Sequence, residues 1–132
     1  MKREIKFRAW DKAKHRMLGV DQLAFGPNGE LVSIYSDGPD FSNDSEALMG
    51  DKPDLNEAVL MQYAGRKDKN GREIYEGDIV KNEYGKVMEV KYDPRSAAFG
   101  VGGYYFGTIG SGKILEVIGN IFEDKQLLEA KQ

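Results

Sequence analysis

The sequence predicts a mainly β protein. A small N-terminal β-sheet subdomain is expected over residues 1–56, and an SH3-like β-barrel subdomain with a short C-terminal helix over residues 57–132. Apolar and polar residues alternate over short stretches, which is the period of a half-buried strand. The 16 glycines among 132 residues suit many turns between short strands and are rarely tolerated by an all-helical protein.

The first predicted strand lies in the opening segment MKREIKFRAWD. Its alternation places Ile5 and Phe7 on one face, where both are expected to be buried. The opposite face carries mostly charge: Lys2, Glu4, Lys6, Arg8 and Trp10. A second strand near Met17–Val20 and a hairpin around Pro27–Gly29, with its return arm at residues 31–35, complete the N-terminal sheet.

The stretch from residue 37 to residue 56 breaks the strand pattern with two prolines, two glycines and six acidic residues. This composition predicts a loop or linker. Within it, Ser45 could cap a short helical turn that ends at Met49.

Strands are predicted to resume in the second half of the chain, at residues 58–64, 73–81, 86–92, 97–106 and 114–121. Asn70-Gly71 supplies the turn between the first two, because Gly adopts the positive φ that a tight hairpin needs. Barrel closure is favoured because it hides edge strands. The tail EDKQLLEAKQ predicts a short helix that needs Leu127 and Leu128 to dock on the body of the protein.

Composition excludes several classes of protein. The chain has no cysteine, so disulfides, zinc-thiolate sites and cysteine nucleophiles are excluded. Its opening residues lack the apolar core of a signal peptide, and no stretch approaches the roughly 18 apolar residues of a membrane span. We therefore expect a cytoplasmic protein that has no membrane partner.

Charge is arranged in blocks along the chain. Residues 1–20 carry a net charge of +5, residues 21–60 carry −8, and the remainder balances to give −3 overall. Blocks of like charge add their fields and can steer a partner. A basic strand packed beside an acidic loop within the same molecule explains the pattern equally well.

Three segments resemble the YopX family of proteins encoded by phages and prophages of Gram-positive bacteria. They are KFRAWD at residues 6–11, QYAGRKDKNGREIYEGDIVK at residues 62–81 and VIGNIFED at residues 117–124. The family more often has threonine and leucine at the positions of Ala64 and Arg66. The resemblance implies a mainly β protein with an SH3-like barrel in a phage or prophage context; the family has no established biochemical activity, so the resemblance leaves the function open.

Motifs of catalysis and of cofactor binding are incomplete. Residues 107–113 satisfy the G-x-x-x-x-G-K pattern of a phosphate-binding loop, but Ile114 stands where the magnesium-binding Ser or Thr belongs. The D-x-N pattern that begins at Asp68 lacks the later glycine and glutamate of a calcium loop. His15 is the only histidine and belongs to no recognised catalytic pattern. We therefore predict a non-enzymatic protein without a metal or cofactor.

One candidate surface is basic and would bind nucleic acid. It combines the N-terminal face with the tip of the second hairpin: Lys6, Arg8, Trp10, Lys12, Lys14, Arg66, Lys67 and Lys69. Cations release counterions from phosphates, and an aromatic ring offers a base a surface for stacking. An acidic pI of about 5.3 argues against this hypothesis, as does a core role for Trp10.

A second candidate surface is aromatic and would bind protein. It consists of Phe99, Tyr104, Tyr105 and Phe106, set among glycines. Tyr and Phe are enriched at interfaces, whereas the alternative is that these side chains fill the barrel. The leading functional prediction is a protein-interaction or self-associating module. Its partner would be a second copy or a host or phage protein, and nucleic-acid binding is the alternative function.

Overall fold

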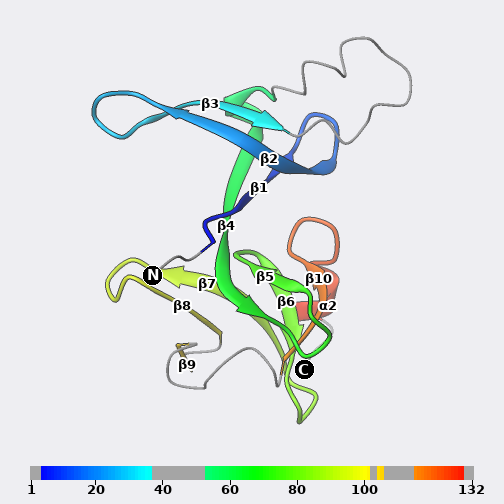
Figure 1. The fold of residues 1–132 in the computed structure, drawn as a ribbon. Coiled ribbons are helices and arrows are strands. Elements are labelled where there is room, and N and C mark those ends of the chain that lie inside the picture. Colours follow the sequence, from blue (N-terminus) through cyan, green and yellow to red (C-terminus); the bar gives the residue numbers. More distant parts are fainter. Residues whose placement is uncertain (1–3, 37–52, 102–103, 106–114, 130–132) are drawn as a thin grey trace. The chain divides into compact units, whose positions relative to one another are not determined.

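The computed structural model describes residues 4–36, 53–101, 104–105 and 115–129. Within these residues the strands form two antiparallel sheets and there is one short α-helix, which confirms the mainly β class (Figure 1). Contacts divide the chain into an N-terminal unit, Lys6–Met61, and a C-terminal unit, Gln62–Gln132 with Met1–Ile5. Within the described residues, no helix is long and apolar enough to cross a membrane. The acidic stretch at residues 37–52, with the helical turn predicted at Ser45–Met49, lies outside the described residues.

The N-terminal unit is built on β1 (Phe7–Asp11), β2 (Arg16–Phe25) and β3 (Leu31–Ser36). β1 pairs antiparallel with β2, and β2 pairs with β3 through the hairpin that the sequence predicts. Ile5 is 60% exposed, so the prediction that it is buried was wrong. The reason is that the strand begins only at Phe7 and leaves Ile5 outside the sheet.

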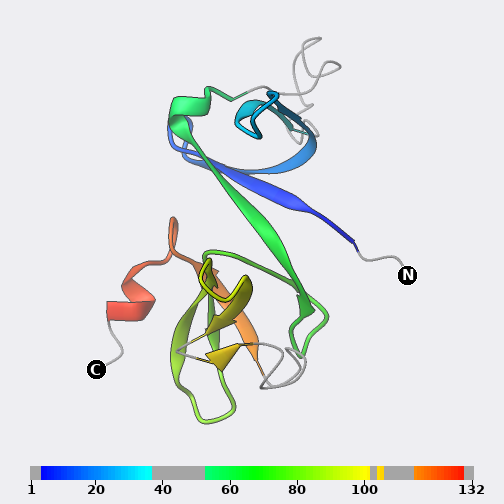
Figure 2. The ribbon, with the colours of Figure 1, turned by 90° about the vertical axis from the view of Figure 1, so that its left-hand side faces the viewer.

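The chain passes from one unit to the other between Ile5 and Lys6 and again within one strand, between Met61 and Gln62. After the 3-10 helix η2 (Leu55–Glu57), β4 (Ala58–Lys67) lies next to β1 in the sheet order and continues into the C-terminal unit (Figure 2). There it pairs with β5 (Glu73–Tyr75). The second of these divisions lies within β4, whereas the predicted subdomain boundary stands between residues 56 and 57.

The main sheet of the C-terminal unit has the order β10-β6-β7-β8-β9. Its strands are β6 (Asp78–Lys81), β7 (Val87–Asp93), β8 (Ala98–Val101), β9 (Tyr104–Tyr105) and β10 (Glu116–Asn120). β9 and β10 are the two outer strands, so the described strands form an open sheet and do not close into the predicted barrel. Closure would need β10 to pair with another strand, and in the described chain the N–H and C=O of Val117 on β10 bond instead to side chains of the loop at residues 68–72.

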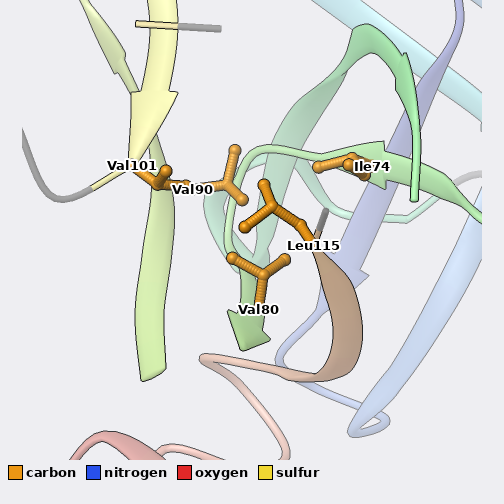
Figure 3. Close-up of a cluster of buried hydrophobic side chains, with 5 residues drawn as sticks. All are labelled: Ile74, Val80, Val90, Val101 and Leu115. Atoms are coloured by element: carbon orange, nitrogen blue, oxygen red, sulfur yellow. The ribbon is translucent and has the colours of Figure 1, made fainter. Parts of the chain in front are cut away.

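The core of this unit is a cluster of aliphatic side chains from five segments (Figure 3). It consists of Ile74, Val80, Val90, Val101 and Leu115. Burying each such side chain stabilises the fold by about 1.5–3 kcal/mol. Met88, two residues before Val90 on β7, packs against this cluster from the same strand face.

The chain ends in the helix α2 (Gln126–Glu129), which confirms the predicted short C-terminal helix. A compact turn precedes it. There the backbone N–H of Asn120 donates to Oδ2 of Asp124 at 3.2 Å. A Cβ atom at Gly119 would stand 2.6 Å from that same oxygen, so the turn requires glycine.

Candidate functional site

The 68–72 loop, which joins β4 to β5, is organised by one buried carboxylate. Asp68 is 4% exposed, and its Oδ1 accepts hydrogen bonds from the backbone N–H groups of Asn70 at 2.9 Å and Arg72 at 2.8 Å. Its Oδ2 accepts from the backbone N–H of Val117, on β10, at 2.9 Å. One side chain therefore shapes the loop and attaches it to β10.

These contacts lower the pKa of Asp68. Burial alone raises the pKa, because it disfavours the charged form. The backbone N–H groups of Val117, Arg72 and Asn70 and the charge of Arg72 outweigh that effect and hold the pKa below the ordinary value of an aspartate. The carboxylate is therefore ionised at neutral pH.

Two basic side chains of the loop also contact β10. Arg72 donates from Nη1 to the carbonyl oxygen of Val117 at 3.1 Å. Lys69 Nζ lies 3.8 Å from a carboxylate oxygen of Glu116, and its backbone N–H donates to the carbonyl of Leu115 at 2.9 Å. Arg66 and Lys67, at the end of β4, are exposed. The basic hairpin tip thus has intramolecular roles at Lys69 and Arg72.

Buried polar side chains also organise the turns at the other two segments that resemble the YopX family, residues 6–11 and 117–124. Oδ1 of Asp11 accepts from the backbone N–H groups of Ala13 and Lys14, and its Oδ2 lies 3.6 Å from Nε of Arg16. The Oδ1 atom of Asn120 accepts from Phe122 and Glu123 in the same manner, at 3.0 Å each. These segments therefore specify turns, which is a structural role.

The N-terminal basic candidates divide into buried and exposed residues. Trp10 is 3% exposed, so its ring is not available for base stacking; instead it contacts the His15 ring edge-on at 5.0 Å between centroids. Lys12 and Lys14 are exposed on the β1–β2 turn, while Lys6 and Arg8 are half-buried. The structure thus retains Lys12 and Lys14 as the accessible basic pair of this unit.

The aromatic candidates lie along β8 and β9. Tyr92 stands directly opposite Phe99, and their ring centroids are 5.1 Å apart in an edge-on arrangement. Phe99 packs against the core cluster, whereas Tyr92 is 41% exposed. Tyr104 and Tyr105 form β9, opposite Val101 and Gly100. Phe106 lies outside the described residues.

Tyr92 is a member of this group that sequence reasoning did not assign to it. The signal that finds it is the β7–β8 register, which only the paired strands reveal. Among the described residues, no group of three or more His, Cys, Asp or Glu side chains is placed to hold a metal ion. The glycine-rich segment at residues 107–113 falls outside the described part of the chain.

Comparison with known proteins identifies the family to which the chain belongs. The model of the YopX protein family matches residues 6–129, which is nearly the whole chain. The chain belongs to the YopX family. No curated protein matches it. Among solved structures, this YopX-family chain is similar to protein EF1440 from Enterococcus faecalis, with 28% identity and a TM-score of 0.66, over 96% of this chain and 99% of that chain.

Proposed function

We propose that the protein is a self-associating interaction module without enzymatic activity, acting as a phage or prophage accessory protein in the bacterial cytoplasm. Its contact surface is the aromatic edge, defined as Tyr92, Phe99, Tyr104 and Tyr105. The partner at this surface is a second copy of the chain. The phage context comes from the YopX family, and the choice of surface comes from the strand arrangement.

The observation that carries the proposal is the exposed ring of Tyr92, on the central strand β7, against Phe99 on β8, which is the neighbour of the end strand β9. A tyrosine that is 41% exposed while its ring contacts another aromatic ring is held in place. Held aromatic side chains bind with little loss of conformational entropy, and tyrosine is enriched at interfaces.

The position of β9 supports the same surface. β9 is an end strand of its sheet, and within the described residues it pairs only with β8. An end strand can add a strand from a partner, with main-chain hydrogen bonds giving affinity and neighbouring side chains giving specificity.

The test is the oligomeric state in solution. Size-exclusion chromatography with light scattering should give a stable oligomer for the wild type and a lower mass for Tyr92→Ser and for the Tyr104→Ser/Tyr105→Ser double variant. The matched control is Tyr84→Ser. Tyr84 is 85% exposed on the β6–β7 turn, so this change also removes an exposed ring but leaves the aromatic edge intact.

The control should keep the wild-type mass, and circular dichroism should show that all variants are folded. A wild type that is monomeric at every concentration contradicts the proposal. So does an oligomer that all the tyrosine variants leave unchanged.

Nucleic-acid binding is the second candidate, and the exposed pair Lys12 and Lys14 on one short turn supports it. If this turn contacts phosphates, Lys12→Ala/Lys14→Ala should weaken binding of a labelled oligonucleotide and reduce the salt slope by up to about 2, one unit for each lost phosphate contact. Lys91→Ala, an exposed lysine on β7, is the control. Binding that is absent at low salt contradicts this function.

A further inference from the structure

Two turns of the chain carry the same dipeptide in the same backbone arrangement. Asn28-Gly29 lies between β2 and β3, and Asn70-Gly71 lies in the 68–72 loop. In each turn the N–H of the glycine donates to the carbonyl three residues earlier at 3.0 Å. The glycine φ is +84° at Gly29 and +86° at Gly71, and all four residues are exposed. The two pairs therefore differ mainly in what holds each turn in place.

The Asn-Gly dipeptide has a reaction of its own. The backbone nitrogen of the glycine attacks Cγ of the asparagine side chain and forms a C–N bond, and the glycine N–H proton passes to the side-chain amide, which leaves as ammonia. Water, the only co-reactant, then opens the five-membered succinimide ring at either carbonyl and yields aspartate or isoaspartate. Glycine favours the attack because it has no side chain to block the approach. Asparagine is accordingly among the thermolabile residues of proteins.

A closed turn protects its asparagine from this reaction. The glycine nitrogen can attack only after its N–H has left the carbonyl to which it is bonded, so the reaction proceeds from a locally opened turn. The free energy of such opening varies from place to place within one folded protein. The rate at each asparagine in the folded protein therefore reports how easily its turn opens.

The turn at Asn70 is attached to another strand. Asp68 is 4% exposed, and it accepts from the N–H of Asn70 and also, through Oδ2, from the N–H of Val117 on β10 at 2.9 Å. The N–H of Lys69 donates to the carbonyl of Leu115, also at 2.9 Å. Opening this turn breaks bonds to a distant segment and leaves a buried carboxylate without its donors, which is costly.

The turn at Asn28 is held by hydrogen bonds within its own tip. Among the residues that the structure describes, Gly26 donates to the carbonyl of Glu30 at 2.8 Å, and the N–H of Asn28 donates to Oε1 of Glu30 at 3.1 Å. Glu30 is exposed, so water can replace its carboxylate as the acceptor. Opening residues 26–30 therefore breaks no described hydrogen bond to another segment.

We propose that Asn28 is a site of spontaneous deamidation in the folded protein, and that the same reaction at Asn70 is suppressed because its loop is attached to β10. The dipeptide and the turn are the same at both positions, so the attachment accounts for the difference. The inference does not depend on the proposed self-association.

The reaction changes the surface of the β2–β3 tip. Aspartate at position 28 places a second negative charge beside Glu30, and isoaspartate adds one carbon to the backbone of the turn. Phe25 and Val32, on either side of the tip, are 58% and 49% exposed. An exposed apolar surface of the N-terminal unit therefore changes as the protein ages.

The test compares the two rates in one sample. The folded wild-type protein is incubated at neutral to mildly alkaline pH, and peptide mapping by mass spectrometry follows aspartate and isoaspartate at both positions. Asn28 should react at least about tenfold faster than Asn70, because one hydrogen bond to a charged group shifts an opening equilibrium by about that factor. Equal rates in the folded protein, or an unmodified Asn28, overturn the proposal.

The same measurement in urea separates the turn from the intrinsic reactivity of the dipeptide. Both turns are lost there, so the two rates should become similar. A difference as large as that in the folded protein would mean that the neighbouring residues set the rates, and it would overturn the proposal.

Asp68→Ala tests the attachment, because it removes the acceptor of the Asn70 and Val117 N–H groups. The rate at Asn70 should rise about tenfold, and the rate at Asn28 should stay unchanged. If this variant does not fold, Arg72→Ala takes its place, because Arg72 is exposed and its Nη1 bonds to the Val117 carbonyl. It should also raise the rate at Asn70, and an unchanged rate in the folded variant overturns the proposal.

Two controls complete the experiment. Asp11 is also buried and also accepts two turn N–H groups, but on β1, so Asp11→Ala should leave the rate at Asn70 unchanged. Equal acceleration by Asp11→Ala and Asp68→Ala would mean general loss of stability and would overturn the proposal. Asn28→Gln has to close a six-membered ring, which is slower, so the acidic species that ion-exchange chromatography resolves on ageing should be largely lost. Its persistence at the wild-type rate contradicts the assignment to Asn28.

Discussion

The carboxylate of Asp68 accepts a hydrogen bond from the backbone N–H of Val117, 49 positions along the chain, at 2.9 Å. This bond joins the turn of the β4–β5 hairpin to the last strand of the other sheet in the same unit. It is made by the charged form of a side chain whose pKa is lowered by folding. The stability of the protein is therefore linked to pH at this position.

The first prediction concerns acid. Because the folded-state pKa of Asp68 lies below its unfolded value, the carboxylate stabilises the fold above that unfolded value of about 3.9, and this contribution is lost as pH falls through the folded pKa. Asp68→Asn removes this titration. Urea unfolding at pH 7 should show a loss of about 1–3 kcal/mol relative to wild type, and the difference should shrink toward pH 2. A difference independent of pH contradicts the assignment.

The second prediction concerns Gly71, which has a φ of +86° in the 68–72 loop. A Cβ atom there would meet no atom within 4 Å, so only backbone strain opposes substitution. Gly71→Ala should lower the free energy of unfolding by about 1–2 kcal/mol. Gly71→Asn should cost less, because asparagine tolerates positive φ. Denaturant unfolding of both variants makes the comparison, and equal losses would show that strain is not the cause.

The strands could be predicted because each shows a local periodicity in the sequence. Which side chains are buried in the assembled sheet could not be predicted in the same way. Alternation placed Trp10 on a charged face, yet Ala9, Trp10 and Asp11 are all buried. β1 lies between β2 and β4, and an inner strand can be covered on both faces. The alternation of apolar and polar residues identifies the buried face of a strand only when the other face is exposed to solvent.

Contacts between distant segments account for the rest. The hairpin at Asn70-Gly71 was recognisable from two adjacent residues, whereas the bond from Val117 to Asp68 depends on a pairing that one sequence does not encode locally. The approach of Tyr92 to Phe99 likewise follows from the β7–β8 register. The turn residues could thus be located from the sequence, while their partners could not.

The third prediction compares two asparagine turns. Asn120 accepts from the N–H groups of Phe122 and Glu123 in a buried site, and Asn82 accepts from Tyr84 and Lys86 in an exposed turn. Asn120→Ala should cost about 1–3 kcal/mol, because two partly buried N–H groups lose an acceptor that is itself buried. Asn82→Ala should cost clearly less, since water replaces the side chain. Thermal unfolding of the pair tests this, and a reversed order would contradict it.

The fourth prediction concerns the core and sets two isoleucines against each other. Ile74 is fully buried in the cluster with Val80 and Leu115, whereas Ile5 is mostly exposed before β1 begins. Ile74→Ala should lower the free energy of unfolding by about 2–5 kcal/mol, because it removes buried methyl groups and leaves a cavity. Ile5→Ala should change it by no more than about 0.5 kcal/mol. Urea titrations followed by circular dichroism measure both values. A loss at Ile5 as large as that at Ile74 would mean that Ile5 is buried in solution, for example against a second copy of the chain, and dilution would then reduce that loss.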